Sequence, residues 1–368
     1  MFIFGVDIEK NSKSSNNKAA KLRSMYQKLI SIMWIMFLLH PIAITFSYEI
    51  RSSKTDFKET LSRKFPIVIA FALWCTLRSR HREIRNSLTN IHYLGNNLSV
   101  VFETVWTKIG LAVTVGVPLL MWLSVSIPFV ENNCQKMMTY FSFNYSYVPE
   151  SYNCVVLCIA MLFYNLGVYA LSTSFAVFYV ILCFHLSKLL HKFSKITSRN
   201  LEDKGCSAIR HHLVTYESLT QTLKSFESTM SFPIFLIQMS DCIVMFYSFV
   251  KLDPFHQSGE RWFLKHYTFS LYFMALKAVA SFLCVSLAAT RVHEACRVIK
   301  DEQEEMLKLV IISPDMHEKE LLLLLVNHNS PPFTLSAWSF FSFNRGMIMS
   351  AVGSILTYSL LILQLDIK

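Results

Sequence analysis

Apolar residues gather along the chain in seven blocks, which polar and charged segments separate. The blocks cover residues 25–47, 65–77, 109–130, 154–184, 232–250, 267–290 and 346–365. Lipid offers no partners to backbone N–H and C=O groups, so each block is predicted to be a membrane-crossing α-helix. The second block is the shortest, because Lys64 and Arg78 bound it. It spans only if both side chains reach toward the interfaces, and without it the chain has six spans.

Three apolar stripes with helical spacing continue beyond these blocks. They comprise Leu186, Leu189, Leu190, Phe193 and Ile196, then Ile209, Leu213, Tyr216, Leu219, Leu223, Phe226 and Met230, and finally Ile299, Met306, Leu307 and Val310. The last stripe stops at Ser313-Pro314, and a further short helix is predicted over about 315–327. We expect these pieces to form a packed cytoplasmic domain of helices. Amphipathic helices that lie flat on the lipid surface are the alternative.

Composition and charge support a membrane protein. Apolar residues make up 53% of the 368 residues and charged residues 16%, whereas soluble proteins average about 45–50% and about 25%. The net charge of +10 does not point to nucleic acid, because Lys and Arg avoid the apolar blocks and collect in alternate connections. About 22 fall on the side of the N-terminus and about nine on the other. This bias predicts a multi-pass plasma-membrane protein with the N-terminus inside and the C-terminus outside, opposite to G-protein-coupled receptors.

One predicted outer loop carries two features of exported segments. Asn144 begins an Asn-Tyr-Ser sequon, and Cys134 and Cys154 flank the same loop. We expect Asn144 to be glycosylated. The two cysteines could form a disulfide if the loop faces an oxidising compartment.

The last block has one small, polar face. Ser350, Ser354, Thr357, Leu361 and Gln364 recur at steps of three and four, so they share one side of a helix. Around a symmetry axis they would form rings of hydroxyls, leucines and amides. Such rings can replace part of an ion's water shell and close by dewetting. The face has no acidic residue, so it predicts weak selection among cations. Helix packing by small residues is the alternative interpretation.

The C-terminal segment resembles a known signature. It contains Pro332-Phe333-Thr334, Phe340-Phe341, Asn344-Arg345, and Thr357-Tyr358 followed by Gln364. Over about residues 320–365 this pattern is similar to the C-terminal signature of arthropod gustatory receptors, which are related to insect odorant receptors. The resemblance implies a tetrameric cation channel whose last helix lines a central pore and whose cytoplasmic anchor domain joins the subunits. It also implies that Gln364 and Leu365 lie at the pore gate. Leu365 stands where the family usually has Phe, which could alter how tightly the gate shuts.

The resemblance and the seven blocks together give an all-α domain layout. Residues 1–24 form a cytoplasmic N-terminus, and 25–290 hold spans one to six, with cytoplasmic extensions at 185–229. Residues 291–345 form the anchor segment. Residues 346–368 form the pore-lining helix and a short outer tail.

Two opposite charges lie inside predicted spans. Asp241 is midway along the fifth and Lys277 lies at a similar depth in the sixth. Each costs about 2.5–3.5 kcal/mol at a helix centre, so we expect them to pair. The pair is either structural or part of a ligand pocket. Further candidates for that pocket are Gln238, Tyr272, Trp122 and Asn165.

The sequence shows no sign of an enzyme. The histidines match no metal-ligand box, and there is no nucleophile elbow or phosphate-binding glycine loop, so we expect no cofactor and no metal. The leading hypothesis is a gustatory receptor, a homo- or heterotetramer that an extracellular small-molecule tastant opens by shifting span five. A G-protein-coupled receptor and a transporter are the alternatives, although the chain shows no internal repeat.

Overall fold

Helices make up nearly all of the described chain. The structure is a computed structural model, and it describes residues 57–100, 104–132, 153–204, 206–251, 262–312 and 332–365 together with parts of 25–43. The elements are α2 (Phe57–Ser79), α3 (His81–Asn97), α4 (Thr104–Asn132), α6 (Asn153–Asn165), the π-helix η3 (Leu166–Ala170), α7 (Leu171–Lys204), α8 (Cys206–Lys251), α9 (Trp262–Ile312), the antiparallel strands β1 (Ser336–Ala337) and β2 (Phe341–Ser342), and α11 (Arg345–Leu365).

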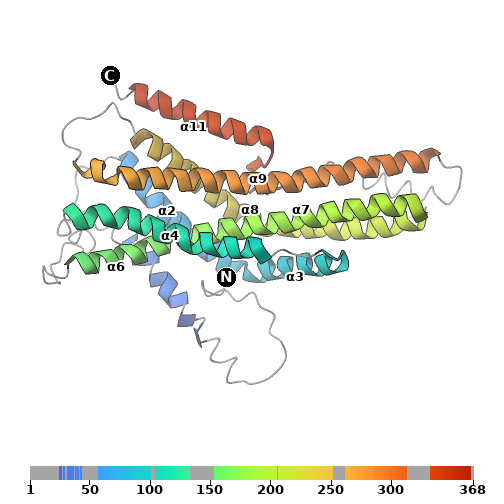
Figure 1. Ribbon diagram of the computed structural model, residues 1–368, viewed down its shortest axis with the longest axis horizontal. Coiled ribbons are helices and arrows are strands. Elements are labelled where there is room, and N and C mark those ends of the chain that lie inside the picture. The colour runs from blue at the N-terminus through green and yellow to red at the C-terminus, as the bar shows by residue number, and fades with distance from the viewer. Residues whose placement is uncertain are drawn as a thin grey trace.

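The helices α7, α8 and α9 run alongside one another through most of the molecule. Figure 1 shows α4, α6 and α11 beside one half of this group and α3 beside the other half. Within the described residues, four helices are long and apolar enough to cross a membrane, namely those at Thr104–Ser126, Cys154–Thr197, Leu213–Ser248 and Phe269–Glu305. Shorter apolar helices occupy Ser31–His40, Phe65–Ser79 and Arg345–Leu361. The all-α membrane fold is confirmed, while the number of spans and their orientation stay predictions.

Helices α7, α8 and α9 continue well past the predicted spans. The side chains of the predicted stripes that are buried between them are Leu186, Leu189, Leu190, Phe193, Leu213, Leu219, Leu223, Phe226, Met230 and Ile299. Helix α9 ends at Ile312, directly before the predicted stop. The predicted helix at 315–327 lies outside the described residues. Helix α3 was not predicted, although Ile84, Ile91 and Leu94 form its buried face.

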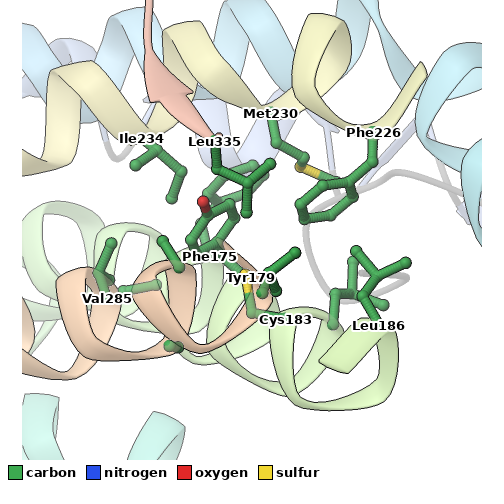
Figure 2. Close-up of a cluster of buried hydrophobic side chains, with 14 of the residues drawn as sticks. Phe175, Tyr179, Cys183, Leu186, Phe226, Met230, Ile234, Val285 and Leu335 are labelled. Atoms are coloured by element: carbon green, nitrogen blue, oxygen red, sulfur yellow. The ribbon is translucent and has the colours of Figure 1, made fainter. Parts of the chain in front are cut away.

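One large hydrophobic core joins the helices to the segment that precedes β1. Figure 2 shows Phe175 and Tyr179 of α7 facing Phe226 of α8 and Leu335, with other apolar side chains around them. The rings of Tyr179 and Phe226 are stacked, with centroids 5.6 Å apart. Because Leu335 is only 1% exposed, it fixes the hairpin onto the helices.

The hairpin leads directly into α11. The N–H of Phe343 donates to the carbonyl of Leu335 at 2.9 Å. Asn344 then caps α11, because its Oδ1 accepts a hydrogen bond of 2.7 Å from the N–H of Met347. The start of α11 is therefore fixed both by the hairpin and by its own cap.

Candidate functional site

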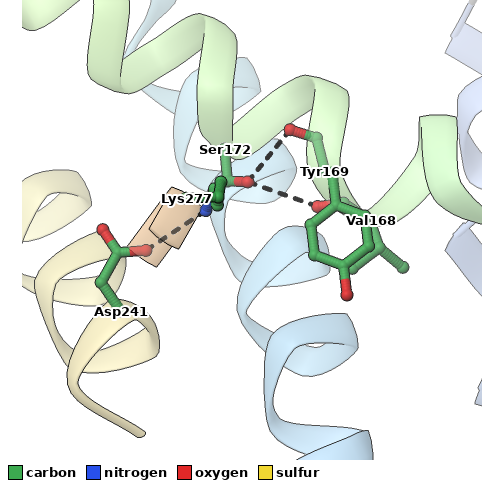
Figure 3. A network of polar contacts seen from close by, with 5 residues as sticks. All are labelled: Val168, Tyr169, Ser172, Asp241 and Lys277. Atoms are coloured by element: carbon green, nitrogen blue, oxygen red, sulfur yellow. Dashed lines mark hydrogen bonds and ion pairs between the residues drawn. The ribbon is translucent and has the colours of Figure 1, made fainter. Parts of the chain in front are cut away.

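A buried ion pair connects α8 and α9. Lys277 Nζ donates to Asp241 Oδ1 at 3.2 Å, and the two side chains are 13% and 1% exposed. Figure 3 shows the pair beside Ser172, Tyr169 and Val168 of the neighbouring helix. The pairing predicted from the sequence is confirmed. Replacing only one member of such a buried pair is costly, because the remaining charge would have no partner.

A small cavity adjoins this pair. Residues from five elements line it: Pro66, Ile69, Val168, Tyr169, Ser172, Ser240, Val244, Met274 and Lys277. It has room for about one water molecule. Its wall is mostly apolar, with hydroxyl groups and the Lys277 ammonium as polar points. A larger molecule therefore enters only if the surrounding helices separate.

The π-helix η3 forms one wall of the cavity. A π turn inserts one extra residue into a helix, and such turns are frequent at functional sites. Ser172 compensates for the altered backbone, because its hydroxyl lies 3.4 Å from the carbonyl oxygen of Val168 and 3.2 Å from that of Tyr169. Tyr169 and Ser172 were not predicted from the sequence, because no residue pattern in this segment indicates a π turn.

Two buried polar atoms one turn from Asp241 have no hydrogen-bond partner among the described residues. They are the amide oxygen and nitrogen of Gln238, whose side chain is 1% exposed. The Asp241 carboxylate contacts the Ser281 hydroxyl as well as Lys277. Each of the two Gln238 atoms costs about 1–3 kcal/mol when it stays unsatisfied. These atoms can accept or donate hydrogen bonds to water or to a ligand that enters between α8 and α9.

The other pocket candidates, Trp122, Asn165 and Tyr272, are not among the residues that line the cavity. Trp122 Nε1 donates to the carbonyl of Cys158 at 2.9 Å, and Asn165 Nδ2 donates to that of Met161 at 2.8 Å. Tyr272 is 58% exposed on the outside of α9. The structure thus brings together Asp241 and Lys277 but not these three residues. Whether any of them contacts a ligand stays a prediction.

Helix α11 packs on α8 and α9 through one narrow face. That face includes Ile348 and Ser359, which are 9% and 4% exposed. The described residues of the predicted polar stripe are all exposed, namely Ser350, Ser354, Thr357 and Leu361. The side chains of Gln364 and Leu365 lie outside the described ones. The stripe therefore points away from the rest of the chain.

The cavity and α11 both border one small core. Val244, Met245, Ala278 and Phe282 form a small core, against which Met274 and α11 residues pack; the α11 residues are Met347, Ala351 and Ile355. Val244 and Met274 also line the cavity. A change in the size of the cavity can therefore reach α11 through this small core.

The predicted outer-loop features fall mostly outside the described residues. Asn144 and Cys134 both lie there. Cys154 is disulfide-bonded, while its pairing with Cys134 stays a prediction. In the described part of the chain, no group of three or more His, Cys, Asp or Glu side chains is placed to hold a metal ion.

Comparison with known proteins gives a family and a fold. A family model described as 7tm Chemosensory receptor matches residues 20–368. Among curated protein sequences, none matches. The structure is similar to that of the insect olfactory receptor OR5 from Machilis hrabei, with 12% identity and a TM-score of 0.67 over 99% of this chain and 95% of that one. The same receptor in complex with eugenol gives 13% identity and a TM-score of 0.70 over the same shares.

Proposed function

The chain belongs to the 7tm chemosensory receptor family, and we propose that it is a gustatory receptor, a ligand-gated non-selective cation channel that an extracellular small-molecule tastant opens. One observation carries the proposal. The polar stripe of α11 is exposed, while an adjacent face of the same helix packs on the small core that borders the cavity beside Lys277. The same helix can therefore line a pore and respond to a ligand.

The pore requires several copies of the chain. Large apolar side chains on α11, including Met349 and Leu360, are 75% and 60% exposed, so water cannot surround the whole helix. In a homo- or heterotetramer, neighbouring subunits and lipid cover these residues, and the stripe of Ser350, Ser354, Thr357 and Leu361 faces the axis. Hydroxyl rings then contact the ions, and the Leu361 ring closes the pore by dewetting. Gln364 and Leu365 lie toward the outer mouth, as the resemblance to gustatory receptors implies.

The gating step follows from the contacts of Val244 and Met274. A tastant enlarges the cavity beside Asp241 and Lys277, which displaces these two side chains and with them α11. Binding opens the pore only as far as the ligand prefers the open state. A shift from 1% to 99% open requires about a 10⁴-fold preference.

A small organic ligand is supported by the fold. The insect olfactory receptor OR5, whose structure this chain resembles, has been solved in complex with eugenol. In this chain the ligand would have to satisfy the unpaired amide of Gln238 while it contacts the apolar cavity wall. The family match does not favour a G-protein-coupled receptor.

Cysteine accessibility tests the pore. Ser350→Cys, Ser354→Cys and Thr357→Cys should react with a charged thiol reagent in patch-clamped cells, faster with agonist than without, and the reaction should change the current. Ile348→Cys is the matched control, because Ile348 is 9% exposed and packs on the other side of α11. Leu361→Arg and Gln364→Ala should alter the current.

Two results would contradict the proposal. The first is stripe cysteines that react no faster than the control while agonist currents persist. The second is an epitope after Lys368 that antibodies reach only in permeabilised cells, because the proposed orientation places this end outside.

A further inference from the structure

The β1–β2 hairpin presents an aromatic patch on the outside of the molecule. Trp338 and Phe340 at its tip are 56% and 75% exposed. The Trp338 ring lies 5.2 Å from that of Phe232 and 5.4 Å from that of Phe235, and Phe340 lies 5.6 Å from Phe235, between centroids. These four residues, here called the aromatic patch, form one continuous apolar surface over α8 and the hairpin.

The backbone holds this tip outward at a cost. Trp338 and Ser339 have φ angles of 51° and 55°, in the left-handed region that non-glycine residues rarely adopt. Each such residue costs about 1 kcal/mol or more, and such strain concentrates at functional positions. The base of the hairpin compensates, because Leu335, Ala337 and Phe343 are at most 1% exposed. The fold thus retains a strained turn that exposes two large aromatic side chains.

The patch lies where apolar helix segments meet charged ones. Arg78 stacks over Trp74 at the end of α2, with 5.6 Å from the guanidinium carbon to the ring centroid. Arg291 lies 5.0 Å from the ring of Phe184, which in turn stacks on Trp106 at the start of α4. Aromatic residues gather at membrane–water interfaces in this manner.

Figure 1 shows the helix ends that carry these contacts. The beginning of α4, the beginning of α11 and the junction of α2 with α3 lie at a similar level along the length of the molecule. The hairpin immediately precedes α11, and Phe232 begins the predicted fifth span. The aromatic patch therefore lies at the same level as the aromatic–arginine contacts.

We propose that the β1–β2 hairpin is a membrane-interface anchor, and that Trp338 and Phe340 insert into the headgroup–acyl boundary of the adjacent leaflet. The size of the patch favours lipid over a protein partner. The two exposed rings offer on the order of 300 Å², whereas a specific protein interface buries at least about 1,000 Å². Such an anchor would set the depth of the first turn of α11 in the bilayer.

Depth-dependent quenching tests the anchor. The full-length protein is reconstituted without agonist in phosphatidylcholine vesicles, with a fluorescent unnatural amino acid in place of Phe340 or, as a matched control, of Ser342. Ser342 is also exposed but lies in β2, outside the patch. Lipids that carry a nitroxide near the headgroup should quench the label at Phe340 at least twofold more than nitroxides near the chain end. Aqueous iodide should preferentially quench the label at Ser342.

Two outcomes would overturn the anchor. Iodide quenching at Phe340 equal to that at Ser342 would place the patch in water. Protection of Phe340 from both lipid and aqueous quenchers would place it against another copy of the chain. Neither result depends on channel currents, so the anchor can fail while the proposed channel stands. A replacement at Trp338 repeats the measurement if the Phe340 variant does not fold.

Discussion

Removing one partner of the Asp241–Lys277 pair should destabilise the chain far more than removing both charges. Asp241 is 1% exposed, so Lys277→Met leaves a buried carboxylate without a counter-charge, at a cost of about 3–5 kcal/mol. Asp241→Asn should cost less, about 2–3 kcal/mol. Lys277 is 13% exposed, and its flexible stem lets the ammonium reach toward a polar region.

The double variant Asp241→Asn, Lys277→Met leaves no unpaired charge. We expect it to lie within about 1–2 kcal/mol of the wild type, so that the coupling between the two sites is about 3 kcal/mol or more, at the upper end of the range for residue pairs. Apparent melting temperatures of the detergent-solubilised protein, followed by size-exclusion chromatography after heating, measure this cycle. The shift in melting temperature per kcal/mol falls as chain length increases. Extrapolated from smaller domains to this chain, Lys277→Met should lower the midpoint of thermal unfolding by on the order of 5–10 °C.

An exposed pair provides the matched control. Lys300 lies 3.9 Å from Glu304 one turn along α9, and the Glu304 side chain is 50% exposed. Lys300→Met should therefore change stability by less than about 1 kcal/mol. The reasoning is refuted if the losses in the two single variants of the buried pair simply add in the double variant, or if Lys277→Met behaves like Lys300→Met.

Two further changes test local packing and capping in the same assay. A Cβ atom on Gly110 would lie 2.8 Å from both Val177 Cγ1 and Ile181 Cδ1, so Gly110→Ala should destabilise by about 1–2 kcal/mol. Gly116 has nothing within 4 Å of such an atom, so Gly116→Ala should be neutral or stabilise by up to about 1 kcal/mol; equal effects at the two glycines would contradict the close approach of α4 and α7. Asn344→Ala should cost about 1 kcal/mol through the lost cap, and Asn344→Asp should restore it; a similar loss in both variants would exclude capping as the cause.

The sequence predicted the helices through block length and stripe periodicity. Long apolar blocks have one stable backbone conformation in lipid, so the apolar segments of α4, α6–α7, α8 and α9 were recognisable. Helix α3 was missed because it is short and polar outside, although the spacing of Ile84, Ile91 and Leu94 is a readable helical signal. The hairpin was not predicted, because Trp338 and Ser339 occupy the turn positions where a sequence usually has Gly or Asn.

The candidate site was predictable only where charge demanded it. A charge inside an apolar helix is costly unless it is paired, so two opposite charges at similar depth were expected to pair. This reasoning identified Asp241 and Lys277. Tyr272 and Trp122 could not be placed in the same way, because apolar residues face both lipid and core on a membrane helix. Periodicity therefore does not tell which side of the helix turns inward.

The length of α9 has a consequence for regulation, because no proline interrupts it. At 1.5 Å per residue, its 51 residues form a helix of about 75 Å, more than twice the thickness of a bilayer core. A tilt of one degree at one end displaces the other by roughly 1 Å. In the proposed channel, thermodynamic reciprocity then applies. A molecule that binds the far end of this helix more tightly in one of the proposed gating states changes the affinity for the proposed ligand, and that ligand changes the affinity for this molecule by the same factor.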